Sequence, residues 1–209
     1  NEAAGEQGKE NKGRKIIVAK RMVEKSKPEL RRTLFQALLE AEYLWKANPV
    51  QRLKGDREKA LVANREWLHG LGIMLLLTEG HASKDNPVAE EAIALISPRA
   101  RTALVQANEN GGLTEELKRF LFPLACEWFA SLYSAMQAEK HGVEVKLKVT
   151  DHLPFLSAVT FRTGTQKQDR VEGSGRTGFY LGPSDEVPGG SLILTLKSDV
   201  DISEDEPET

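Results

Sequence analysis

The segment from Thr114 to His141 constrains the fold more than any other part of the sequence. Its central stretch, FLFPLACEWFASLYSAM, is apolar around almost the whole circumference of a helix. Thr114 is a favourable N-cap, and the helix dipole favours the acidic residues at the start and Lys140 at the end. We therefore expect a buried central helix with a kink at Pro123. Four of its side chains are expected to be mostly inaccessible: Phe120, Leu124, Trp128 and Leu132.

The sequence before this segment carries further helical patterns. Residues 15–25, KIIVAKRMVEK, place apolar residues among lysines and predict a short amphipathic helix. A second helix is expected from Pro28 to Ala47. A third is expected from Asp56 to Gly80, in which Gly70 and Gly72 mark either a close helix crossing or a break. Two more helices are expected to begin at Asn86-Pro87 and at Ser97-Pro98. Trp45, Trp67 and Trp128 fall on apolar helical faces, which predicts core packing for all three.

The hydrophobic period changes from helical spacing to two at Val143. In VEVKLKV, residues 143–149, apolar residues alternate with charged ones, and FLSAVTF, TGFYL and SLILTLK follow between Gly-rich turns. The predicted fold class is α+β: a bundle of five to six helices over residues 14–142, then a small antiparallel sheet of three to four strands over residues 143–198. Residues 1–13 and the acidic residues 199–209 are expected to be disordered, because they can bury too little apolar surface.

The fragment RVEGSGRTGFYLG matches the pattern G-x-G-x-x-G at Gly173, Gly175 and Gly178. In a dinucleotide-binding loop the glycines link a strand to a helix whose N-terminus meets the pyrophosphate. Here Phe179 to Leu181 favours a strand, and the prolines that follow oppose a helix. We therefore expect a hairpin, with no helix within five residues of Gly178. Its long basic loop is either a solvated loop or a phosphate-binding nest.

No other pattern indicates catalysis, a cofactor or a metal. The only cysteine, Cys126, lies on the apolar central helix, where a buried, inert thiol is expected. The four histidines lack the spacing of zinc ligands, and no G-x-S-x-G motif is present. The sequence therefore predicts no catalytic residue, no cofactor and no metal site.

Basic residues gather near the N-terminus although the formal net charge is −2. From Lys9 to Arg32, ten Lys or Arg residues face three Glu residues. A solvated helix face and contact with a phosphate backbone both explain this excess. The candidate polyanion-binding residues are Lys12, Arg14, Lys15, Lys20, Arg21, Lys25, Lys27, Arg162, Lys167, Arg170 and Arg176.

These features predict a non-catalytic protein-interaction module: an adaptor, regulatory or assembly subunit with another protein as its partner. The alternative is a nucleic-acid-binding subunit that uses the basic residues named above. No apolar run reaches the roughly 18–20 residues of a membrane span, which predicts no membrane partner, and the single cysteine fits a reducing, cytoplasmic compartment. Self-association stays open. The chain does not begin with Met, which is compatible with a fragment or a processed product.

Overall fold

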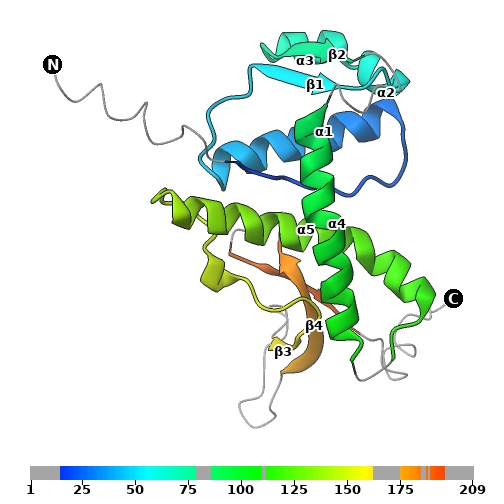
Figure 1. Ribbon diagram of the computed structural model, residues 1–209, viewed down its shortest axis with the longest axis vertical. Coiled ribbons are helices and arrows are strands. Elements are labelled where there is room, and N and C mark those ends of the chain that lie inside the picture. The colour runs from blue at the N-terminus through cyan, green and yellow to red at the C-terminus, as the bar shows by residue number, and fades with distance from the viewer. Residues whose placement is uncertain are drawn as a thin grey trace, which may run out of the picture.

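Figure 1 shows the computed structural model, which describes residues 15–78, 86–109, 112–161, 175–184, 187 and 189–195. This part of the chain is mixed α+β, with five α-helices, a two-stranded parallel sheet and a three-stranded antiparallel sheet. The predicted α+β class is confirmed, whereas the helices only loosely resemble a bundle. The segments predicted to be disordered, 1–13 and 199–209, lie outside the described residues.

The first structural unit contains α1 (Lys27–Tyr43), β1 (Arg52–Gly55), α2 (Lys59–Val62), α3 (Arg65–Gly70) and β2 (Met74–Leu77). The side chain of Ser26 caps α1, and β1 pairs with β2 in parallel. The core of this unit consists of Leu61, Leu68 and Ile73, against which Leu30, Leu34 and Leu38 of α1 pack.

The single helix predicted from Asp56 to Gly80 is wrong, because the chain forms α2, α3 and then a strand. Of the two alternatives for Gly70 and Gly72, the break is confirmed: Gly72 has a φ of 76°, a left-handed conformation that ends the helix. The run MLLL that follows is short, and its composition fits either a helix or a buried strand. It forms a strand because it pairs with β1.

Helices α4 (Pro87–Ala107) and α5 (Glu115–Lys140) pack against each other in the second unit. The predicted start of a new helix at Ser97-Pro98 is wrong, because α4 continues through Pro98. Pro98 cannot donate a backbone hydrogen bond. Side chains of this part of α4 also donate to its carbonyls: Arg99 donates to the Leu95 carbonyl and Thr102 to that of Pro98, each at 3.0 Å.

α5 is the central helix of this unit, and it contributes eight buried residues to the core. The side chain of Thr114 accepts from the Leu117 amide at 3.2 Å, which confirms the predicted cap. The predicted core face is correct at Leu124 and wrong at Phe120, whose side chain is 56% exposed. Trp128 and Leu132 are half-buried. Leu121, next to Phe120, is fully buried instead, so the core face at the start of α5 includes Leu121 and Leu124 and excludes Phe120.

The antiparallel sheet contains β3 (Ala158–Phe161), β4 (Arg176–Pro183) and β5 (Ser191–Leu194), in that order. Gly178 lies inside β4, which continues to Pro183 and pairs with β3, so the predictions of a hairpin and of no helix within five residues of Gly178 are confirmed. Gly173 lies outside the described residues. The strand predicted at residues 143–149 is wrong. Its apolar residues pack around Trp45 and Ala138. The alternating apolar side chains are therefore buried against a helix surface and not in a sheet.

The helix predicted at residues 15–25 is also wrong. Residues 15–26, here called the N-terminal strap, are extended and have no helical turn. Side chains of α5 bind the strap backbone: Ser134 Oγ accepts from the Ile17 amide at 3.0 Å and donates to the Ile17 carbonyl at 2.9 Å. The Arg21 amide donates to Glu127. These contacts replace the backbone hydrogen bonds that a helix would have made.

The core therefore consists of three clusters. One lies beneath α1, and another joins α4 and α5 to the antiparallel sheet. The third is a smaller cluster around Trp45, which contacts α5 and the strap. In Figure 1, α5 lies between α1 and the antiparallel sheet. This arrangement leaves one side of α1 uncovered by the described residues.

Candidate functional site

The uncovered side of α1 carries a row of large apolar side chains. Phe35, Leu39 and Tyr43 are 47%, 49% and 51% exposed. Because they are spaced four residues apart, they lie one above the other on one helix face. On another face of α1, Leu30, Leu34 and Leu38 are partly buried against the core, so α1 is apolar on two sides. We call Phe35, Leu39 and Tyr43 the α1 row.

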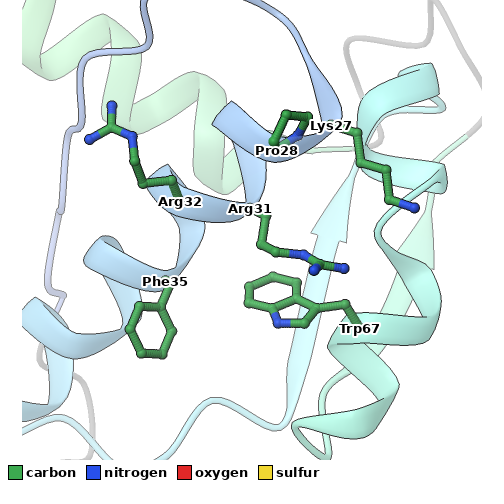
Figure 2. A pocket seen from close by; sticks show the side chains of 6 residues that line it. All are labelled: Lys27, Pro28, Arg31, Arg32, Phe35 and Trp67. Carbon is green, nitrogen blue, oxygen red and sulfur yellow. The ribbon is translucent and has the colours of Figure 1, made fainter.

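A cavity of about 490 Å³ lies at the N-terminal end of the α1 row (Figure 2). It is lined by Lys27, Pro28, Arg31, Arg32, Phe35 and Trp67. The guanidinium carbon of Arg31 lies 5.2 Å from the centre of the Trp67 ring, within the range of a cation–π contact. We call this cavity the basic-aromatic pocket.

Asn64 holds the walls of the basic-aromatic pocket in place. Its side chain is fully buried and joins α1 to α2 and α3. Its Nδ2 donates to the carbonyls of Lys27 and Ala60 at 3.0 and 2.9 Å, and its Oδ1 accepts from Arg31 Nε at 3.3 Å. The Arg31 side chain is therefore positioned before any partner binds.

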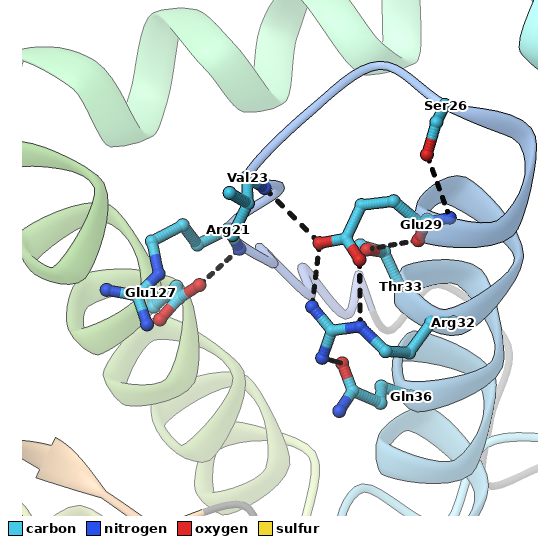
Figure 3. A network of polar contacts seen from close by, with 8 residues as sticks. All are labelled: Arg21, Val23, Ser26, Glu29, Arg32, Thr33, Gln36 and Glu127. Atoms are coloured by element: carbon cyan, nitrogen blue, oxygen red, sulfur yellow. Dashed lines mark hydrogen bonds and ion pairs between the residues drawn. The ribbon is translucent and has the colours of Figure 1, made fainter.

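The charges of this region are not equally available to a partner. Arg32 donates two hydrogen bonds to the Glu29 carboxylate, at 2.7 and 3.0 Å, and the Val23 amide donates a third at 3.2 Å (Figure 3). Chiefly because of the Arg32 hydrogen bond, the pKa of Glu29 falls to about 2. Glu29 thus compensates the charge of Arg32. Lys27 and Arg31 form no ion pair with the residues that the structure describes.

A second cavity, of about 710 Å³, lies at the other end of the α1 row. Leu39 and Tyr43 line it together with Leu147 and Pro183. Its charged lining residues are balanced, with Lys20 and Lys146 opposite Glu40 and Asp151. Lys146 lowers the pKa of Tyr43, first through a side-chain hydrogen bond and then through its charge. The α1 row therefore runs from a basic end to an apolar end without excess charge.

The structure separates the candidate polyanion-binding residues. Lys15 pairs with Glu91 at 2.7 Å, Lys20 with Glu40, and Lys25 with Glu58 at 3.2 Å, so three different elements supply the carboxylates. Arg21 binds Glu127 through its backbone, and Arg176 begins β4 as an exposed residue. Among the candidates that the structure describes, Lys27 alone lines the basic-aromatic pocket. Five candidates lie outside the described residues: Lys12, Arg14, Arg162, Lys167 and Arg170.

Arg31, Phe35 and Trp67 are residues that the sequence reasoning did not place in a site. Of the three tryptophans expected in the core, only Trp45 is fully buried, and Trp67 forms a pocket wall. The spacing of Arg31 and Phe35, four residues apart, was a local signal. Trp67 could not be linked to them without knowing how α3 packs against α1.

Burial raises the pKa of the Cys126 thiol, which disfavours the reactive thiolate. In the described part of the chain, His, Cys, Asp and Glu side chains form no group of three or more that could hold a metal ion. Nor does any helix described here combine the length and apolar character needed to cross a membrane. No family model, curated protein or solved structure matches the chain.

Proposed function

We propose that this protein is an interaction module that binds another protein through the outward face of α1. The observation that carries the proposal is the α1 row, which is half-exposed and joins two cavities. A continuous apolar row of this kind is typical of surfaces that take an amphipathic helix, whose side chains fill the cavities at regular spacing.

The charge distribution indicates which kind of segment would bind. Lys27 and Arg31 lie at the N-terminal end of α1, where the helix dipole adds positive potential. The other end of the α1 row has balanced charge. The expected partner is an amphipathic segment with acidic residues near Lys27 and Arg31 and apolar residues over Leu39 and Tyr43. Arg31 and Tyr43 are twelve residues apart, a rise of roughly 18 Å, so the partner needs a little more than three helical turns.

Nucleic-acid binding is the competing hypothesis, and the structure offers it less support. Carboxylates neutralise Lys15, Lys20 and Lys25, which would otherwise contact phosphates. The exposed face of α1 is apolar over two turns, whereas a phosphate backbone needs an extended row of cations. An amphipathic acidic protein segment can contact both the basic residues Lys27 and Arg31 and the apolar α1 row.

The test uses a fluorescein-labelled synthetic peptide with three Glu residues in its first turn and Leu at three positions spaced by four. Fluorescence anisotropy measures its binding to the full chain. Leu39→Asp should weaken binding at least tenfold, because it places a carboxylate in the apolar contact. The matched control is Ile93→Asp on α4, since Ile93 is also exposed, at 64%, but lies outside both cavities.

Charge reversal separates the two hypotheses. The double variant Lys27→Glu, Arg31→Glu should weaken binding of the acidic peptide and make the affinity less dependent on salt. A peptide with Lys in place of Glu should bind the wild type poorly. Equal effects of Leu39→Asp and Ile93→Asp would contradict the proposal. Tight binding of a labelled single-stranded oligo(U) probe that outcompetes the peptide would favour nucleic acid instead.

A further inference from the structure

Ser131 and His152 form a hydrogen-bonded pair away from the α1 row. Ser131 Oγ lies 2.9 Å from His152 Nε2, and His152 Nδ1 lies 3.0 Å from the carbonyl oxygen of Lys148. A carbonyl oxygen can only accept, so Nδ1 carries a proton. Nε2 of the neutral ring is then the acceptor, and the Ser131 hydroxyl donates to it. This order, hydroxyl to imidazole to a fixed acceptor, is the arrangement by which a base activates a serine nucleophile.

Local structure fixes the imidazole on both sides. His152 directly follows the short 3₁₀ helix Val149–Asp151, and the Asp151 carboxylate accepts from the Lys148 amide at 2.7 Å. On the other side of His152, the Leu153 carbonyl accepts from Trp128 Nε1 at 3.0 Å. Burial lowers the pKa of His152, which keeps the ring neutral and able to accept a proton near pH 7.

Ser131 lines a cavity of about 280 Å³ enclosed by the strap, α1, α5 and β4. Leu124 and Trp128, on the same face of α5, line it as well, and Leu181 and Gly182 of β4 close it. This volume lies just below the roughly 300–1,000 Å³ of typical small-molecule sites, so only a small ligand fits. Its charged lining residues are three basic and two acidic: Lys20, Arg21, Arg32, Glu40 and Glu127. Lys20 is paired with Glu40 and Arg32 with Glu29, so the lining carries no excess of positive charge.

We infer that Ser131 is a nucleophile activated by His152, and that this cavity takes an ester or thioester with a short acyl chain. The activity would be additional to the binding function of α1 and does not depend on it. The sequence-based expectation of a protein without catalytic residues missed this pair, because Ser131 and His152 belong to no motif and lie on separate elements.

The reaction follows from the hydrogen bonds. Ser131 Oγ attacks the carbonyl carbon of the ester while its proton moves to His152 Nε2. The bond to the leaving alkoxide or thiolate then breaks, and the leaving group takes that proton from His152. A water molecule attacks the acyl-serine with His152 as its base, and the carboxylic acid leaves as Ser131 regains its proton. Neither step needs a reactant other than the ester or thioester and water.

The test is covalent labelling of the full-length protein with a fluorophosphonate probe, with the modified residue located by peptide mass spectrometry. The expected result is labelling at Ser131, together with a burst of one p-nitrophenolate per chain from p-nitrophenyl acetate. Ser131→Ala should abolish both. Ser134→Ala is the matched control, because Ser134 lies one turn further along α5 and bonds only to the strap backbone.

Removing the imidazole of His152 shows whether the hydrogen bond between Ser131 and His152 is catalytic or purely structural. His152→Gln should lower the labelling rate at least 100-fold, consistent with the loss of a general base. The rate should recover partly when free imidazole is added to His152→Ala. In the wild type the labelling rate should rise with pH, with a midpoint below 6.5, the ordinary pKa of a histidine.

The inference is overturned if Ser131 stays unlabelled in the folded wild type, or if His152→Gln is labelled at the wild-type rate. Peptide binding at α1 is measured separately and is unaffected by either result.

Discussion

At the scale of single residues, Glu29 shows how one side chain can organise a terminus. Its carboxylate binds Arg32 and the Val23 amide, while its own amide donates to the Ser26 cap at 3.4 Å. Glu29 therefore ties the strap to the first turn of α1 (Figure 3). Because Lys27 and Arg31 belong to the same two turns, this network also supports the basic-aromatic pocket.

Glu29 should make stability depend on pH in a defined window. The folded state lowers the pKa of Glu29 from 4.5 to about 2, so its carboxylate stabilises the fold fully above about pH 4.5. That contribution is lost as the pH falls from 4.5 towards 2. The free energy of unfolding of wild type minus that of Glu29→Gln should be constant from pH 5 to 7 and shrink below pH 4.5. Urea unfolding at several pH values measures it. A difference that stays constant down to pH 2 would contradict the assignment, and Arg32→Gln should reduce the same pH dependence.

Residues of the candidate site were only partly predictable. The excess of basic residues identified Lys27 as a candidate, and the pocket includes it. The same criterion also selected Lys15, Lys20 and Lys25, which pair with carboxylates 76, 20 and 33 positions away in the sequence. Local charge counts cannot show such pairing, because it depends on which elements come together.

At the scale of elements, periodicity predicted which residues face apolar surroundings, but not what covers them. The alternation at residues 143–149 is real, yet its apolar side packs on α5 and Trp45 rather than in a sheet. The strap is a similar case, because the Ser134 side chain binds its backbone. The three strands of the antiparallel sheet and the cap at Thr114 were predictable, since neighbouring residues determine them.

The register of α5 yields a prediction for a pair of adjacent residues. Leu121 is fully buried and Phe120 is 56% exposed. Leu121→Ala should lower the free energy of unfolding by roughly 2–5 kcal/mol, because it leaves a cavity between α4 and α5. Phe120→Ala should cost less than about 1 kcal/mol, although it removes a larger side chain. Chemical denaturation of both variants measures the difference. The reverse order would mean that the core face of α5 is the one predicted from the sequence.

At the scale of the whole molecule, the two structural units are joined by a small contact region. Their main core clusters contain different elements, with α1 and the parallel sheet in one and α4, α5 and the antiparallel sheet in the other. Trp45 links them: it is fully buried, packs with Ala135 and Ala138 of α5, and donates from Nε1 to Glu40 at 3.0 Å. Glu40 in turn pairs with Lys20 of the strap, and both side chains are almost entirely buried.

Trp45→Ala should therefore reduce cooperativity as well as stability. Removing a buried tryptophan costs roughly 3–5 kcal/mol, and here the loss falls on the contact between the units. The α1 unit should then unfold before the α5 unit, with a smaller denaturant slope and earlier hydrogen exchange in α1 than in α5. Leu68→Ala is the matched control, because Leu68 is equally buried but lies inside the α1 unit. Both variants should be destabilised, and only Trp45→Ala should separate the two exchange rates further. A single transition with an unchanged slope in Trp45→Ala would show that the strap alone is enough to hold the units together.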